Sequence, residues 1–136
     1  MPQSRFYLRA WHIYQVKNLA TTTTKIVRYK VKKKKLSKLK TALAAFVEDI
    51  RKNESGIVHY EVFQEKDDPT ILVHVMTFKD KKAESAHAKS THVQKWVKTL
   101  SSVCKEKPEF TDLKLVESIK GSEPSSYAST VQEPQQ

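Results

Sequence analysis

Residues 57–78, IVHYEVFQEKDDPTILVHVMTF, contain the pattern that decides the fold of this chain. Two apolar stretches, 57–64 and 71–78, flank a polar turn in which Pro69 keeps Asp68 out of helical geometry. The short gap between the stretches predicts an antiparallel hairpin. One face of the first strand is expected to carry Val58, Tyr60 and Val62. One face of the second strand is expected to carry Leu72, His74, Met76 and Phe78.

A strand and a helix are predicted before the hairpin. Residues 25–32, KIVRYKVK, alternate between apolar and basic side chains, which indicates a half-buried strand. Six apolar residues between Leu36 and Ile50 then recur at helical spacing. We expect this helix to run to about Asn53, with Gly56 supplying the stop.

Two helical pieces and a strand are predicted after the hairpin. Asp80 is suited to cap a helix that runs to about Lys89. Thr91 and Gln94 have the spacing of a capping box for a second helical piece, whose apolar stripe includes Trp96. After Pro108, a last strand is expected around residues 112–118.

The order β-α-β-β-α-β predicts an α+β fold of the ferredoxin-like type with a four-stranded antiparallel sheet. Two helices cover only one face of such a sheet, so a second copy of the chain is expected on the other face, giving a homodimer. This domain is assigned to residues 25–119. Residues 1–24 form a basic, aromatic extension that could be a leader or an accessory element, and residues 120–136 a polar tail of disordered composition.

Composition excludes several classes of protein. The single cysteine, Cys104, permits no internal disulfide, and no stretch approaches the roughly 20 apolar residues of a membrane span. Gly56 and Gly121 are the only glycines, which excludes Gly-rich phosphate loops. These features favour a cytoplasmic protein, or a mitochondrial one if residues 1–24 are a transit peptide.

Basic residues are concentrated in the first third of the chain. Residues 1–47 contain twelve Lys or Arg and no acid, whereas the rest has thirteen against fifteen acids, so the two segments carry +12 and −2. The run Lys32–Lys35 falls at a strand–helix corner, where cations oppose the helix dipole. Solubility or an anionic partner could explain this run, and the sequence leaves both open.

His87 is the first candidate for a functional side chain. It shares a helix face with Ala83, Ala86 and Ser90, small residues that leave room for a pocket beside the ring. His92 lies five residues on, about 140° around a helix, with a break expected between. The two imidazoles therefore do not form an i, i+4 chelating pair, no HExxH motif occurs, and no metal site is predicted.

Short signatures in order along residues 25–117 resemble the antibiotic biosynthesis monooxygenase domain family. The stretch from Ala42 to Trp96 carries a helix ending in Arg and Gly, a Tyr-bearing strand, an Asp-Asp-Pro turn, a strand ending in an aromatic residue, and Ala-His followed by Ser and His. The positions that match are Arg51, Gly56, Tyr60, Asp68, Pro69, Phe78, Ala86, His87, Ser90 and His92.

The resemblance implies a dimeric α+β barrel with a pocket between sheet and helices. It also implies oxygenation of a phenol or quinol by dioxygen without a cofactor. The base would be His87, with His74 second, and Tyr60 would orient the substrate hydroxyl. The residues expected to contact an aromatic substrate are Phe78, Trp96, His92, Arg51 and Met76.

The chain also departs from the family pattern. The family commonly has Trp at the position of Phe78 and an acid at that of Met76, and lysines replace its usual Pro-Gly after the first strand. The Asn, Trp and His set of the haem-degrading branch is not found. A non-catalytic dimer that binds a small metabolite is therefore the alternative function. The sequence argues against RNA binding, because the predicted strands lack the glycine of an RNP segment.

Overall fold

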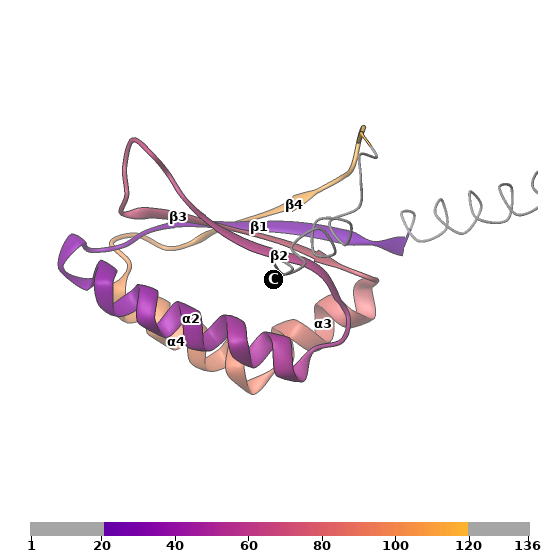
Figure 1. Cartoon of the computed structure of the whole chain (residues 1–136), viewed down its shortest axis with the longest axis horizontal. Coiled ribbons are helices and arrows are strands. Elements are labelled where there is room, and N and C mark those ends of the chain that lie inside the picture. Colours follow the sequence, from indigo (N-terminus) through magenta and orange to yellow (C-terminus); the bar gives the residue numbers. More distant parts are fainter. Residues whose placement is uncertain (1–20, 120–136) are drawn as a thin grey trace, which may run out of the picture.

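The computed structural model describes residues 21–119, in which a sheet forms one layer and helices the other (Figure 1). The helices are a 3-10 turn η1 (Lys33–Lys35), α2 (Leu36–Asn53), α3 (Lys81–Lys89) and α4 (Thr91–Val103). The strands are β1 (Thr23–Lys30), β2 (Ile57–Gln64), β3 (Ile71–Phe78) and β4 (Glu109–Leu113). The expected ferredoxin-like order is thus confirmed, with the second helix in two pieces. Most of the predicted extension, and the tail at 120–136, lie outside the described residues.

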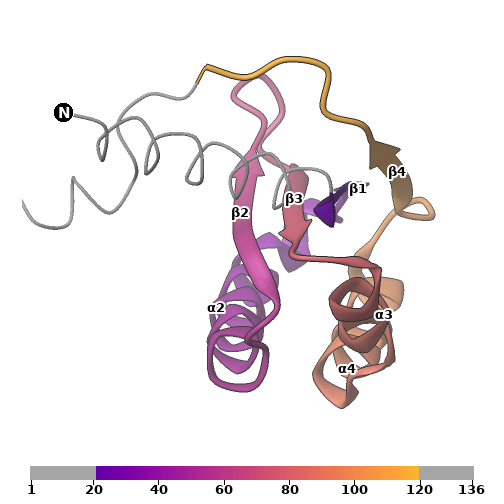
Figure 2. The same cartoon turned by 90° about the vertical axis from the view of Figure 1, so that its right-hand side faces the viewer.

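The sheet has the order β2-β3-β1-β4, and each neighbouring pair is antiparallel. Register places Val27 of β1 opposite His74 of β3, and His74 opposite Val62 of β2, so these side chains share the face that looks toward the helices. The core between the layers includes Tyr29, Leu72, Met76 and Phe78, as the alternating pattern predicts. Figure 2 shows α2 on one side and α3 with α4 on the other, both beneath the same face of the sheet.

Two strands differ from their predicted bounds. The strand predicted at 25–32 begins earlier, because Thr23 and Thr24 pair with Phe78 and Thr77 and so extend the ladder. The strand predicted around 112–118 is found at Glu109–Leu113, because its ladder with β1 runs only from Arg28 to Thr24.

Val58 does not share a face with Tyr60 and Val62, as the simple alternation predicted. A register shift between Ile57 and His59 places Ile57 opposite Phe78 instead, and Val58 is 60% exposed. A local bulge of this kind moves one side chain out of the alternating pattern.

The corner after α2 does not use the conformational freedom of glycine. Gly56 has no positive φ, but a Cβ built on it would lie 2.5 Å from the Cβ of Ala83. The chain therefore crosses α3 at a distance that only a residue without a side chain permits. Gly56 brings the end of α2 against α3.

Ser90, and not Thr91, is the N-cap of α4. Its Oγ accepts a hydrogen bond from the Val93 amide at 3.4 Å and donates one to the carbonyl of His87 at 2.6 Å. The same residue is the C-cap of α3. One side chain therefore ends α3 and begins α4, and so fixes the backbone between His87 and His92.

Candidate active site

A cavity of about 120 Å³ lies between the sheet and the helices. Six of the predicted site residues line it, namely His74, Tyr60, Met76, Phe78, His87 and Trp96. Its walls are mainly apolar and aromatic, and Phe46 stacks on Trp96 with 4.8 Å between ring centroids. Val97 and Phe110 also line the cavity and are partly exposed, so the cavity reaches solvent near them. Such an apolar pocket with a few polar groups is typical of a small-molecule site.

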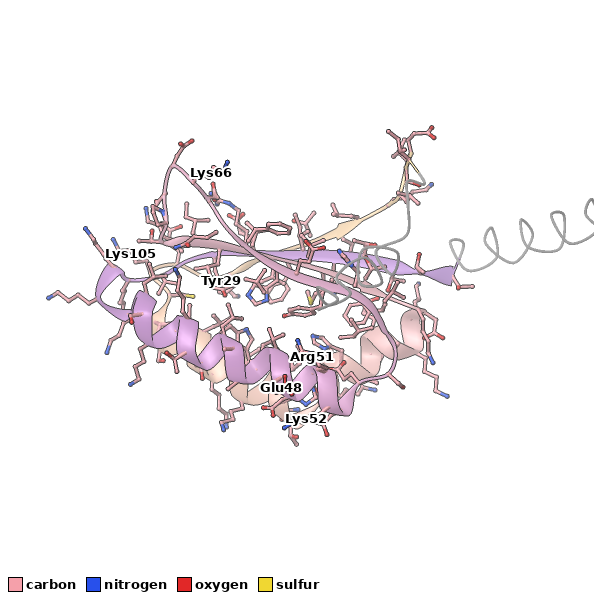
Figure 3. All side chains as sticks on the ribbon, in the orientation of Figure 1. Tyr29, Glu48, Arg51, Lys52, Lys66 and Lys105 are labelled. Carbon is pink, nitrogen blue, oxygen red and sulfur yellow. The ribbon has the colours of Figure 1, made fainter. Side chains whose placement is uncertain are left out.

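His74 is held between two tyrosines. Its Nδ1 lies 2.7 Å from the Tyr60 hydroxyl, and its Nε2 lies 2.7 Å from the Tyr29 hydroxyl. Figure 3 shows Tyr29 in the space between the sheet and the helices. His74 is 2% exposed, and burial, together with the nearby His87, lowers its pKa to about 4. The ring is therefore neutral at pH 7.

The burial of Tyr29 decides the direction of these hydrogen bonds. If His74 donated to Tyr29, the buried Tyr29 hydroxyl would have no acceptor among the described residues, which costs about 1–3 kcal/mol. Tyr29 therefore donates to Nε2, and the Nδ1–H of His74 donates to the Tyr60 oxygen. Tyr60 is then free to donate its own proton into the cavity that it lines. Burial also raises the pKa of both tyrosines, so both hydroxyls keep their protons.

Glu54 joins the two histidines of the helical segment. Both carboxylate oxygens of Glu54 lie 2.9 Å from Nδ1 of His87, and Oε2 lies 2.5 Å from Nε2 of His92. The exposed fractions of the three side chains are only 10–11%. Glu54 has no salt bridge to a Lys or Arg among residues 21–119. The carboxylate is thus stabilised by the two imidazole N–H groups.

Three local features bring these side chains together. Glu54 is the C-cap residue of α2, and its amide donates to the carbonyl of Ile50. The close approach of Gly56 to Ala83 sets the end of α2 beside α3. Ser90 then turns the chain so that the rings of His87 and His92 have centroids 6.4 Å apart. The helix break, which was expected to separate the two histidines, instead allows both to reach one carboxylate.

The second ring nitrogen of His87, Nε2, is not engaged by Glu54. When the neutral ring donates its Nδ1–H to Glu54, Nε2 carries the lone pair. Nε2 has no hydrogen-bond partner within residues 21–119. It is not fully buried. Because His87 lines the cavity, Nε2 can accept a proton from a molecule bound in it.

The remaining predicted residues lie outside the cavity. Arg51 is exposed on α2 and pairs with Glu48 (Figure 3). His92 contacts Glu54 and lines two surface grooves. Ala86, expected on the inward face, is exposed and lines one of these grooves.

Glu54 and Phe110 are among the residues of the site that were missed from the sequence. Glu54 lies in the α2–β2 loop, where neither helical nor strand periodicity applies. Its position shortly before Gly56 was the only sequence feature that could have pointed to it. Phe110 was placed outside the last strand. The sequence argument against a metal site assumed that the two histidines lack a converging third ligand, but Glu54 supplies one.

Comparison with protein families gives a match over residues 22–99 to the model named antibiotic biosynthesis monooxygenase. The chain belongs to the antibiotic biosynthesis monooxygenase family. A search of curated proteins found no match. Among the described residues, no helix is long and apolar enough to cross a membrane.

Solved structures of other proteins share the fold. A conserved protein from Methanosarcina mazei is 21% identical with a TM-score of 0.67, and the alignment covers 73% of this chain and 97% of that one. A provisionally assigned antibiotic biosynthesis monooxygenase from Nitrosomonas europaea is 25% identical with a TM-score of 0.63, covering 68% and 88%. A Mycobacterium tuberculosis protein is 19% identical with a TM-score of 0.66, covering 72% and 98%.

Proposed function

We propose that this family member is a small monooxygenase that oxidises a single-ring phenol or quinol with dioxygen and uses no cofactor. The observation that carries the proposal is the orientation of His87. Its Nδ1–H is held by the Glu54 carboxylate, and its ring lines an apolar, aromatic cavity, so Nε2 is the nitrogen left for a bound molecule. A carboxylate behind an imidazole fixes the ring and stabilises the imidazolium that forms when the ring accepts a proton.

Tyr60 provides the second polar group of the proposed site. Its hydroxyl, which accepts from His74, has its own proton available for a bond to the substrate oxygen. The rings of Tyr60 and His87 have centroids 6.2 Å apart, and both line the cavity, so the two groups lie in the same part of it. In the proposed reaction His87 accepts the phenolic proton while the hydrogen bond from Tyr60 stabilises the phenolate. His74, neutral and bonded at both nitrogens, positions Tyr60 and is not the base.

The proposed chemistry needs no electron source besides the substrate. After deprotonation, the ring anion of a hydroquinone adds dioxygen at a ring carbon to give a hydroperoxide. Loss of water from that hydroperoxide leaves a hydroxyquinone. One oxygen atom of dioxygen is then retained in the product and the other leaves as water, with all four electrons supplied by the quinol. The protein contributes the base, the orientation and the exclusion of water.

The cavity wall restricts the size of the proposed substrate. Phe78 and Trp96 line the cavity and can pack against an aromatic ring, and Met76 can adapt to its shape. A volume of about 120 Å³ is close to the roughly 150 Å³ of a cavity that holds benzene. A single ring is therefore the substrate class that we propose.

We also propose a homodimer formed through the sheet. The described helices cover only one face of the sheet (Figure 2). The other face carries apolar side chains, among them Phe63 on β2, which is 51% exposed, and Leu113 on β4. A second copy packed on this face would bury them.

Oxygen uptake by the purified full chain, with substituted hydroquinones as substrates, tests the enzymatic proposal. We expect uptake that depends on the protein, with the hydroxyquinone detected by mass spectrometry. His87→Gln should lower kcat by about 100-fold or more, since that is the range for loss of a general base. His59→Gln is the matched control, because His59 is exposed on β2 and pairs with Glu61 away from the cavity. Binding of hydroquinones without oxygen uptake would instead support the alternative of a non-catalytic metabolite-binding protein.

A further inference from the structure

The cluster of Glu54, His87 and His92 has a property that the proposed reaction does not use. One ligand atom from each of the three side chains lies within 4.8 Å of the others. Nδ1 of His87 and Nε2 of His92 are the nitrogens that contact the Glu54 carboxylate. We propose that these three side chains form a binding site for a divalent transition-metal ion of the zinc type. No sequence motif indicates this site, because its ligands come from three segments, the α2–β2 loop, α3 and α4.

The identity of the donor atoms selects the class of ion. Two imidazole nitrogens and one carboxylate oxygen are a donor set that suits zinc and its neighbours, whereas calcium and magnesium prefer oxygen ligands. In a tetrahedral site with bonds of about 2.1 Å, the donor atoms lie roughly 3.4 Å apart. The carboxylate oxygens now lie 2.9 and 2.5 Å from the two nitrogens. Side-chain shifts of about 1 Å would therefore convert the hydrogen-bonded cluster into a three-coordinate metal site with a position left for water.

The surroundings of the cluster are also compatible with a metal ion. Among the described residues, the carboxylate of Glu54 is not neutralised by any Lys or Arg, so its charge is available to the ion. The three side chains are largely shielded from solvent, which strengthens electrostatic attraction. A surface groove lined in part by Glu54, Ser90 and His92 gives an ion a route to the site. Fixed backbone positions at Gly56 and Ser90 hold the ligands in place.

Metal binding would change the atom that His87 presents to the cavity. In the hydrogen-bonded cluster a neutral His87 carries its proton on Nδ1, which contacts the carboxylate, and its lone pair on Nε2. A neutral imidazole that binds a metal through Nδ1 carries its proton on Nε2. The metal-bound protein would then lack the proton acceptor in the cavity. This consequence rests on the proposed function: the ion would act as a reversible inhibitor, and not as a cofactor.

Zinc titration of the untagged, chelator-treated full chain by isothermal calorimetry tests the site itself. We expect one ion per chain. Loss of a group that merely orients a ligand weakens metal binding 10–100-fold, so Glu54→Gln and His92→Ala should each weaken it by about 100-fold or more. His59→Ala and Cys104→Ser are the matched controls and should bind as the wild type does, because both residues lie outside the cluster. Circular dichroism of each variant verifies that it is folded.

Cobalt provides an independent readout of the same site. Tetrahedral Co²⁺ gives intense visible absorption, which should appear with the wild type and with the control variants, and disappear in His92→Gln. Zinc binding that is absent, or that survives both Glu54→Gln and His92→Ala in folded protein, would overturn the metal site whatever the oxygenase assay shows.

Oxygen uptake measured during the zinc titration tests the inhibitory consequence. Uptake should fall in proportion to occupancy and return after chelation. Uptake that is unchanged or increased at full occupancy would refute inhibition while leaving the site intact. Absence of uptake in the metal-free wild type would refute the proposed oxygenase function, and the calorimetric result would still decide the metal site.

Discussion

Two histidines line one cavity in different environments. His74 on β3 is bonded at both nitrogens to tyrosine hydroxyls, and burial lowers its pKa to about 4. His87 on α3 is bonded at one nitrogen to a carboxylate, and its other nitrogen has no partner in the described part of the chain. The comparison shows that the partners of an imidazole, more than its presence in a pocket, determine whether it stabilises the fold or can take part in chemistry.

The largest expected difference between His74 and His87 is in their contribution to the stability of the fold. His74→Ala removes the partner of two buried or half-buried hydroxyls and leaves a cavity, so the free energy of unfolding should fall by about 3–5 kcal/mol. His87→Ala should cost less than half of this, because Glu54 keeps its bond to His92. Urea denaturation of the two variants measures both values. Equal losses, or a larger loss for His87→Ala, would remove the distinction between the two histidines.

The pH dependence of stability should follow His74. Its folded pKa of about 4 lies below the unfolded value of 6.5, so the unfolded chain binds more protons between these two values. Stability is therefore complete above about pH 6.5 and is lost as the pH falls toward about 4. The difference between these two pKa values corresponds to about 3 kcal/mol. Urea denaturation at pH 7 and pH 4 should show a smaller loss in His74→Gln than in the wild type, and an identical loss in both would contradict the assignment.

The geometry of the Glu54 cluster should depend on Gly56. Gly56→Ala places a Cβ against that of Ala83 and should destabilise the protein by about 1–3 kcal/mol. Ala83→Gly removes the opposing atom, so the double variant should recover part of the loss. A double-mutant cycle by thermal denaturation measures the coupling, and strictly additive effects would show that the two residues do not meet.

The smallest effect is expected at the two tyrosines that bond His74. Tyr29→Phe and Tyr60→Phe should each lower the free energy of unfolding by about 1–2 kcal/mol, because each leaves one nitrogen of a buried imidazole unpaired. Only Tyr60 donates into the cavity, so Tyr60→Phe should reduce oxygen uptake by at least about tenfold and Tyr29→Phe much less. Denaturation and oxygen uptake measured on the same samples separate the two roles.

Most of the fold could be predicted from the sequence because burial imposes a period. The alternation of Leu72, His74, Met76 and Phe78 identified the inward face of β3, and the stripe through Phe46 identified that of α2. The bulge at Ile57 and the close approach at Gly56 could not be predicted in this way. Each depends on which segment of the chain packs against it, and the local sequence pattern does not contain that information.

The candidate site was predicted only where it coincides with the core. His74, His87 and Tyr60 lie on periodic inward faces and were identified. Glu54 is a loop carboxylate whose importance comes from two histidines 33 and 38 residues away, and separation of this kind leaves no local signal. The hydrogen bond between Tyr29 and His74 was missed for the same reason, because these residues are 45 positions apart.

The junction at Ser90 has a mechanical consequence. Since this residue ends α3 and begins α4, no linker separates the two helices. Any change in their relative angle must be absorbed by the torsion angles of a single residue. Such a rotation would alter the separation of the two imidazoles and, with it, the span that the Glu54 carboxylate bridges.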